Sequence, residues 1–323
     1  MTKILVTLSI ILLLLGLPYF VQMNKLKTLT ASDIPTAGAW VSLKEGNLYY
    51  RWHYPDEKVS NNETVVLVHG FSTPQFVWDG MKGLLLDAGY SVLGFDHYGR
   101  GYSERPRIKY TRDVFVQSLK ELLDSQKISE SVHLVGYSMG GPVVGHFTSE
   151  FPDMVESISL IAPAGFMAEN PTKDWWIMKR LVGEWFLNVF GSRLVFQGNE
   201  EKSEPSREDP LALSKKEFIK KVEIQMQYKG FINALLSTAR NFNFFSTQEM
   251  FCDVGNLNKP ILTIWGTEDE VVPFMGRKEL TNYIPQSELL ILEGGKHDIT
   301  YAEPSMVGAA IRDFLMSQPK AEA

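Results

Sequence analysis

Short apolar runs recur along the chain and predict buried β-strands. They span residues 64–68, 91–95, 132–135, 157–162, 260–265 and 288–292. Each run is too short for a helix and rich in β-branched or aliphatic residues, which favours buried parallel strands. Helical patterns lie between several of them, for example at residues 111–126 and 139–150. This alternation predicts an α/β fold with a doubly wound, mostly parallel sheet.

Two regions depart from this alternation. Residues 40–43 and 47–54 alternate apolar and polar positions around Glu45-Gly46, which predicts a hairpin. The interval from residue 162 to residue 260 is too long for a simple crossover. It holds helical patterns at residues 175–190 and 215–241, separated by a charged loop at residues 199–210. We therefore expect an inserted helical lobe at residues 166–250, and a core built from residues 25–165 and 251–323.

The first 24 residues form a separate hydrophobic segment. No charged residue lies between Lys3 and Lys25. As a helix this stretch is about 30 Å long, which matches the hydrocarbon thickness of a bilayer. No Ala-x-Ala pattern follows it, so we predict a single-pass N-terminal membrane anchor. A signal peptide cleaved on export and a buried N-terminal helix are the alternatives, and the near balance of flanking lysines leaves the side of the membrane open.

Composition excludes several classes of protein. Hydrophobic residues make up 44% and charged residues 22% of the chain, which excludes a disordered or collagen-like protein. The net charge of −6 disfavours a nucleic-acid partner. The single cysteine, Cys252, cannot form an internal disulfide. Because no metal-ligand spacing, P-loop or dinucleotide fingerprint occurs, we expect no cofactor and no metal site. The oligomeric state stays open.

The strongest local signal is the sequence Gly-Tyr-Ser-Met-Gly at residues 136–140. It matches the G-x-S-x-G pattern of a nucleophile elbow, with a predicted strand before it and a helical pattern after it. Glycines are needed there because the turn from strand to helix is tight. Ser138 is therefore the candidate nucleophile, at the positive end of the following helix.

A serine hydroxyl is a weak nucleophile and needs a base. Among the six histidines, His297 follows the last predicted strand, at the sheet edge where catalytic groups gather. The base in turn needs an acid that fixes its tautomer and stabilises the imidazolium. Glu268, Asp269 and Glu270 lie together after the preceding strand and supply the candidates.

The chain order of serine, acid and histidine resembles the α/β-hydrolase superfamily. Residues 136–140, 266–273 and 295–297 match its motifs, and the match covers residues 40–315. The His-Gly-Phe sequence at residues 69–71 resembles the family's oxyanion loop, although it continues HGFS rather than HGGG. Residues 96–103 resemble its D-x-x-G-x-G-x-S turn. The inserted lobe resembles the family's helical cap.

The resemblance implies roles for particular residues. It selects Asp269 as the acid, and it makes the backbone N–H groups of Phe71 and Met139 the donors of an oxyanion hole. Arg100 and Arg105 lie in and beside the 96–103 turn. For both arginines we expect structural ion pairs rather than contacts with an anionic substrate.

The resemblance to bacterial esterases and monoacylglycerol-lipase-like enzymes implies a serine hydrolase of carboxylic esters. Ser138 would attack the ester carbonyl, with His297 as general base, and water would hydrolyse the acyl-enzyme. The predicted anchor and the aromatic lobe favour apolar acyl esters or a monoacylglycerol-like lipid. The same triad also serves C–C bond hydrolases, haloperoxidases, amidases and acyltransferases, and a non-catalytic ligand-binding protein is a further alternative.

Overall fold

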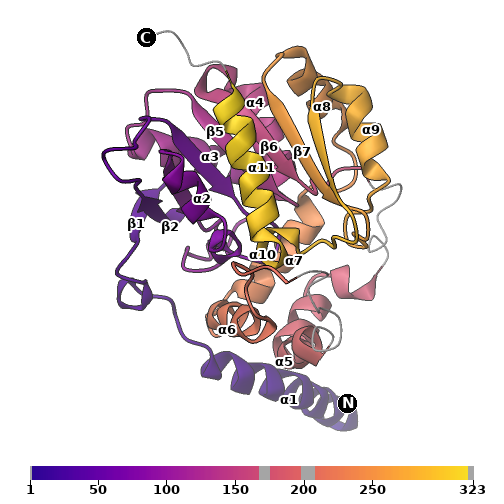
Figure 1. Cartoon of the computed structure of the whole chain (residues 1–323). Helices are drawn as coiled ribbons and strands as arrows, with labels where there is room; N and C mark the ends of the chain where they lie inside the picture. Colours follow the sequence, from indigo (N-terminus) through magenta and orange to yellow (C-terminus); the bar gives the residue numbers. More distant parts are fainter. Residues whose placement is uncertain (1, 167–174, 198–207, 319–323) are drawn as a thin grey trace.

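A single mixed β-sheet organises the fold (Figure 1). The computed structural model describes residues 2–166, 175–197 and 208–318. Within them the sheet has eight strands in the order β1-β2-β4-β3-β5-β6-β7-β8. The strands are β1 (Ala39–Leu43), β2 (Gly46–His53), β3 (Thr64–Val68), β4 (Ser91–Phe95), β5 (Val132–Tyr137), β6 (Val155–Ile161), β7 (Ile261–Gly266) and β8 (Glu288–Leu292).

The pairing follows the expected pattern. β1 and β2 form the antiparallel hairpin, and β2 also runs antiparallel to β4. The neighbours from β4 through β8 all pair in parallel. The prediction of a doubly wound, mostly parallel sheet is therefore confirmed. The parallel strands from β3 to β7 are covered on both faces, which explains their nearly continuous apolar sequences. The expectation of a buried strand at residues 288–292 is wrong, because β8 lies at the edge of the sheet and exposes Leu289 and Ile291.

Helices cover both faces of the sheet, and alternate strand residues face them. Val66 and Val68 point into one apolar cluster, whereas Val65 and Leu67 point into the other. The first cluster includes residues of α3 (Arg112–Ser125), α4 (Gly140–Glu150), α8 (Gln248–Asn256) and α9 (Gly276–Tyr283). The second includes residues of α2 (Lys82–Asp87) and α11 (Pro304–Ser317). The short α10 (Ile299–Ala302) precedes α11.

The helical pattern predicted over residues 215–241 is two helices. They are α6 (Lys215–Met226) and α7 (Phe231–Asn241). Gly230 separates them with φ of 94°, a left-handed conformation that interrupts a helix. The backbone of Lys27 pairs with the segment between the two helices. The Lys27 N–H donates to Gln227 O, and the Lys27 carbonyl accepts from Lys229 N.

The pattern predicted over residues 175–190 is also divided. A 3₁₀ turn, η4 (Trp176–Met178), is followed by α5 (Val182–Gln197), and Leu181 between them has φ of 68°. We call η4, α5, α6 and α7 the inserted helices, because they lie between β6 and α8 in the sequence. Most of the predicted charged loop at 199–210 lies outside the described residues. The predicted end of the lobe at residue 250 falls inside α8, which packs against α4 and α9.

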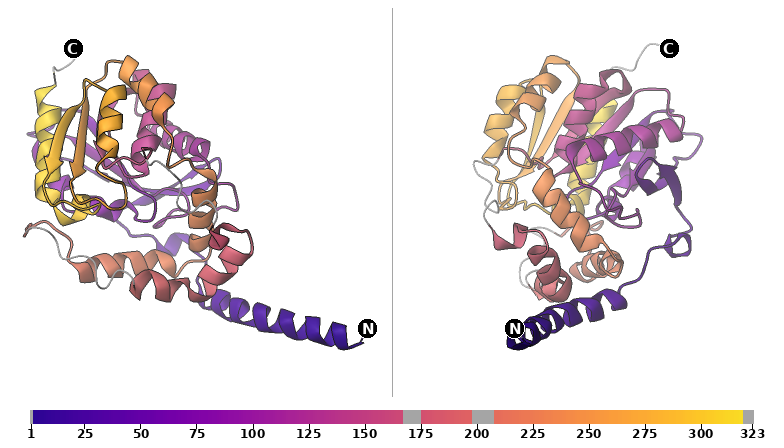
Figure 2. Two further views of the ribbon diagram at one scale, coloured as in Figure 1. Left: turned by 90° about the vertical axis from the view of Figure 1, so that its right-hand side faces the viewer. Right: turned by 180° about the vertical axis from the view of Figure 1, so that it is seen from behind.

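The N-terminal segment forms a helix, α1 (Thr2–Lys25). It runs beside the inserted helices, away from the sheet (Figure 2). Trp185 of α5 donates its indole N–H to the Leu15 carbonyl at 2.6 Å. Among the described residues, no helix combines the length and the apolar character needed to cross a membrane. The predicted membrane-spanning segment is therefore not confirmed.

Candidate active site

Ser138 occupies a strained turn between β5 and α4. It has φ of 54°, which is uncommon for a residue other than glycine. Its N–H donates to Ile161 O at 2.9 Å, so the neighbouring strand holds the turn in place. A Cβ at Gly140 would lie 2.1 Å from Val68 O, and this close approach requires glycine. The side chain of Ser138 thus projects at the carboxyl edge of the sheet.

His297 and Asp269 reach Ser138 from the loops that follow β8 and β7. The imidazole Nε2 lies 3.0 Å from Ser138 Oγ, and Nδ1 lies 2.7 Å from Asp269 Oδ2. An ionised carboxylate only accepts hydrogen bonds, so Nδ1 carries the proton. The free Nε2 can then accept from the serine hydroxyl. The structure brings the three predicted residues together as one hydrogen-bonded chain.

Backbone donors hold the Asp269 carboxylate. Its Oδ1 accepts from Val271 N at 2.9 Å and from Val272 N at 2.8 Å. The side chain of Asp269 is fully buried. Glu268 and Glu270 instead line the cavity in front of Ser138. Of the three acidic candidates, Asp269 is the one that contacts the imidazole.

The predicted oxyanion donors belong to two segments beside Ser138. Met139 directly follows the serine and precedes α4. Phe71 belongs to the 69–73 loop after β3, where a Cβ at Gly70 would contact the Cβ of Ser138 at 3.2 Å. Within the described residues, neither the Phe71 N–H nor the Met139 N–H donates to another protein group. Both donors therefore stay available to a ligand oxygen.

His69 is a structural residue of the 69–73 loop. Burial lowers its pKa to about 3, so the ring is neutral. Its Nε2 accepts from His97 N at 2.9 Å, which leaves Nδ1 to donate to Gly70 O at 2.8 Å. The ring thereby fastens the loop to the turn that follows β4.

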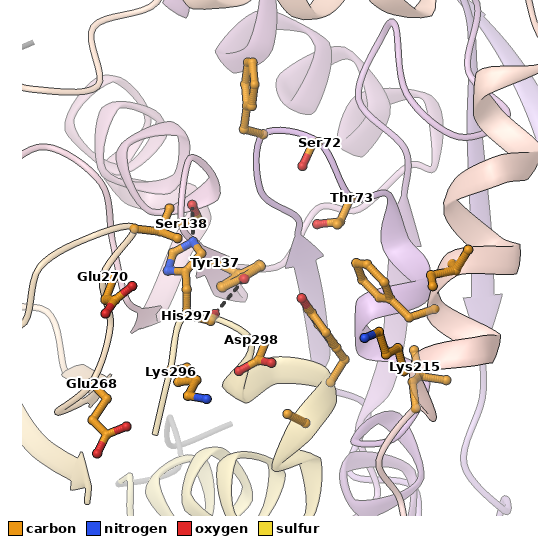
Figure 3. Close-up of a pocket in the computed structure, with 17 residues that line it drawn as sticks. Ser72, Thr73, Tyr137, Ser138, Lys215, Glu268, Glu270, Lys296, His297 and Asp298 are labelled. Atoms are coloured by element: carbon orange, nitrogen blue, oxygen red, sulfur yellow. Dashed lines mark hydrogen bonds between the residues drawn. The ribbon is translucent and has the colours of Figure 1, made fainter. Parts of the chain in front are cut away.

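A cavity of about 760 Å³ opens in front of Ser138 and His297 (Figure 3). The apolar part of its wall comes from Phe71, Leu213, Phe218, Ile219, Val271, Tyr301 and Ala302. Lys215, Lys296, Asp298, Glu268 and Glu270 add charge. The cavity thus lies between α6 and the loops that follow β3, β7 and β8. In the described part of the chain, no cluster of three or more His, Cys, Asp or Glu residues could hold a metal ion.

Sequence reasoning missed Tyr137, which supports His297. The Tyr137 hydroxyl donates to His297 O at 2.7 Å, and the two rings pack with centroids 5.1 Å apart (Figure 3). Tyr137 occupies the first variable position of G-x-S-x-G, where the pattern accepts any residue. The sequence therefore gives no signal for this role.

The expectation that Arg100 and Arg105 form ion pairs is wrong. Within the residues that the structure describes, neither guanidinium forms an ion pair with a carboxylate within 4.0 Å, although Arg105 interacts electrostatically with the buried carboxyl of Asp96. Arg105 donates to Gly101 O at 2.6 Å and lies over the ring of Tyr228. Arg100 donates to two carbonyls and to the hydroxyl of Thr238. Both arginines instead donate hydrogen bonds to uncharged carbonyl or hydroxyl oxygens inside the protein.

Comparison with known proteins supports the fold. The family model described as "alpha/beta hydrolase fold" matches residues 63–304. The chain belongs to this α/β-hydrolase family. Its relatives include the monoacylglycerol lipase abhd6-A of Xenopus laevis, which is 25% identical over 296 residues, covering 84% of this chain and 81% of the lipase.

Solved structures of other α/β-hydrolase proteins share the fold. A bromoperoxidase from Bacillus anthracis superposes with a TM-score of 0.68 at 23% identity, covering 87% of this chain and 100% of the bromoperoxidase. A thermophilic esterase from Thermogutta terrifontis gives a TM-score of 0.69 at 19% identity, covering 86% and 98% of the two chains. The predicted membership of the α/β-hydrolase superfamily is thus confirmed, and a monoacylglycerol lipase and an esterase are among the proteins that this chain resembles.

Proposed function

We propose that this α/β-hydrolase protein cleaves carboxylic esters through Ser138, His297 and Asp269. One observation carries the proposal. The hydrogen-bonded chain from Asp269 through His297 ends on Ser138 Oγ, with distances of 2.7 and 3.0 Å, at the wall of a cavity with apolar sides. That arrangement suits a nucleophile, its base and an orienting acid.

The reaction would proceed in two halves. Ser138 Oγ attacks the ester carbonyl carbon while its proton passes to His297 Nε2. The N–H groups of Phe71 and Met139 stabilise the oxyanion that forms. The bond to the leaving alcohol then breaks as His297 returns the proton to the alcohol oxygen. Water, deprotonated by His297, attacks the acyl-enzyme, and the proton returns to Ser138 Oγ as the acid leaves.

The cavity supports an apolar acyl substrate. Phe71, Phe218, Ile219 and Leu213 offer aliphatic and aromatic surface to a hydrocarbon chain. Charged side chains at the same cavity suit the more polar alcohol part of an ester such as a monoacylglycerol. The substrate class proposed is therefore apolar acyl esters and monoacylglycerol-like lipids.

The test is turnover of p-nitrophenyl esters of graded acyl length, together with labelling by a fluorophosphonate probe. Ser138→Ala should abolish both, whereas Ser72→Ala, which removes a second hydroxyl from the same cavity, should preserve both. Aryl diketones, and peroxide with bromide, test the C–C hydrolase and haloperoxidase alternatives. Full ester turnover by Ser138→Ala would refute the assignment.

We also propose that α1 associates with a lipid surface. Support comes from its large apolar side chains, several of which are more than half exposed: Ile4, Leu5, Ile10, Leu13, Leu14, Leu17 and Phe20. Lys25 and Lys27 follow them and suit anionic headgroups. Flotation with vesicles containing anionic lipid tests the idea. A protein lacking residues 1–24 should lose binding and keep ester turnover, and unchanged flotation would contradict the proposal.

A further inference from the structure

Three successive carbonyl groups of the 69–73 loop are each held by a different buried side chain. His69 Nδ1 donates to Gly70 O at 2.8 Å. Arg100 Nε donates to Phe71 O, also at 2.8 Å. Gln225 Nε2 donates to Ser72 O at 2.8 Å. The loop that presents the Phe71 N–H is therefore fixed peptide by peptide.

The first of these bonds acts directly on the proposed oxyanion donor. The carbonyl of Gly70 and the N–H of Phe71 belong to the same planar peptide unit, on opposite sides of it. Holding that carbonyl consequently aims the N–H. The bonds to Phe71 O and Ser72 O fix the two peptide units that follow. They thereby prevent rotation of the Gly70–Phe71 peptide.

Two of the three supports lead into the inserted helices. Gln225 lies on α6, and its Oε1 also accepts from Gly101 N at 3.0 Å, which ties the helix to the turn after β4. Arg100 belongs to that turn, and its Nη2 donates to Thr238 Oγ1 of α7 at 2.9 Å. The positions of α6 and α7 are therefore coupled to the backbone of the loop.

Burial makes these contacts hard to exchange for water. Gln225 is 1% exposed, and Arg100 and Thr238 are completely buried. Arg100 has the rings of Phe71 and Phe115 around its guanidinium and, among the described residues, no carboxylate partner. A buried polar or charged group that loses a partner is strongly disfavoured. Arg100 and Gln225 thus have few alternative arrangements.

We infer that Gln225 and Thr238 are positioning residues, which hold the Phe71 N–H in place for the transition state through Ser72 O and through Arg100. The inserted helices then contribute to the chemical step in addition to enclosing the substrate. The inference rests on the proposed ester hydrolysis. Interactions of this kind act on the transition state more than on the bound ester, so kcat responds and KM does not.

Two substitutions remove the contacts at nearly constant volume. Thr238→Val deletes the acceptor of Arg100, and Gln225→Met deletes both amide bonds. Each variant should lower kcat by about 10- to 100-fold with KM within about twofold. The affinity for an alkyl trifluoromethyl ketone, which forms a tetrahedral adduct on the serine, should fall in parallel with kcat/KM. Thr238→Ser keeps the hydroxyl and should restore the wild-type values.

Thr148→Val is the matched control. Thr148 is also fully buried and bonds to the carbonyl four residues earlier, Val144 O at 2.8 Å, just as Thr238 bonds to Ala234 O at 2.9 Å. It lies on α4 and should leave kcat unchanged. Thermal unfolding confirms that each variant is folded. If either Thr238→Val or Gln225→Met does not fold, the other variant carries the test.

The outcomes separate the two proposals. If the wild-type protein neither hydrolyses esters nor reacts with the fluorophosphonate, the proposed function fails and the inference fails with it. If the wild-type protein is active while both variants keep its kcat and its affinity for the ketone, only the inference is overturned. A change in KM alone would assign the inserted helices to substrate binding and would likewise overturn it.

Discussion

His297 Nδ1 lies 2.7 Å from Asp269 Oδ2, although the two residues are on separate loops at the ends of β8 and β7. The carboxylate is immobilised by the N–H groups of Val271 and Val272, which bond to its other oxygen. The imidazole is therefore oriented from one side by a fixed acceptor, and its second nitrogen faces Ser138. This relationship determines the tautomer on which the proposed chemistry depends.

Replacing Asp269 should be severe. Asp269→Asn offers an amide where the imidazole needs an acceptor and favours the wrong tautomer, so we expect kcat to fall by about 10⁴-fold. Glu268→Gln removes a neighbouring carboxylate that lines the cavity and should leave kcat within about threefold of wild type. Steady-state kinetics on a p-nitrophenyl ester provides the measurement. A larger loss for Glu268→Gln than for Asp269→Asn would show that the wrong acid was chosen.

Tyr137→Phe removes the hydrogen bond to His297 O and keeps the ring that packs on the imidazole. A hydrogen bond of this kind contributes about 1 kcal/mol, so we expect kcat to fall by about fivefold with KM unchanged. Tyr301→Phe is the matched control, because Tyr301 also lines the cavity but packs on Phe218 instead. Equal effects of the two variants on kcat would argue against a role for Tyr137 in positioning His297.

The stability of the protein should fall on acidification. Burial lowers the pKa of His97 well below its usual value, so the folded state keeps this ring neutral. The unfolded chain protonates it below about pH 6.5, and unfolding then takes up a proton. Such a group lowers the free energy of unfolding by up to about 1.4 kcal/mol for each pH unit below that value. Asp96 opposes the trend, because burial raises its pKa to about 6 and the folded state takes up a proton there.

His97→Phe isolates this contribution, since the ring packs between Phe95 and Phe115. Urea unfolding at pH 7, 6 and 5 should give a free energy of unfolding that falls less steeply with decreasing pH for the variant than for the wild type. The difference in slope should correspond to about one fewer proton taken up on unfolding. The comparison uses the slope with pH, because loss of the bond to His69 O shifts stability at every pH. An identical slope would contradict the buried, neutral state of His97.

Two glycines should respond to alanine in opposite directions. In Gly140→Ala the new Cβ would lie 2.1 Å from Val68 O, a backbone atom that cannot move without displacing β3. We expect a loss of about 3 kcal/mol of stability or more. Gly83 of α2 has open space around its Cβ position, so Gly83→Ala should add about 0.5 kcal/mol. Thermal or urea unfolding distinguishes the two, and tolerance of Gly140→Ala would contradict the tight elbow.

Local sequence patterns predicted the sheet and the approximate place of each site residue. The apolar runs at 64–68 and 91–95 coincide with β3 and β4, because a strand buried on both faces needs apolar side chains throughout. The run at 288–292 coincides with β8, but this edge strand is largely exposed, so its position was predicted and its burial was not. The breaks in the inserted helices were missed. Leu181, between η4 and α5, has a left-handed backbone conformation that could not be predicted from a leucine. Gly230 carried a signal, but an isolated glycine within a helical pattern is often tolerated.

The sequence by itself determined the strand-to-helix turn at Ser138 and the order of serine, acid and histidine, because both are encoded by neighbouring residues or by strand ends. Only the tertiary structure decided which groups meet across the chain. The bond from Tyr137 to His297 O and the links from Thr238 and Gln225 to the 69–73 loop join residues far apart in sequence. Such contacts depend on how helices and loops pack over the sheet edge. The hydrophobic pattern within one segment cannot predict them, because it contains no information about which distant segment packs against it.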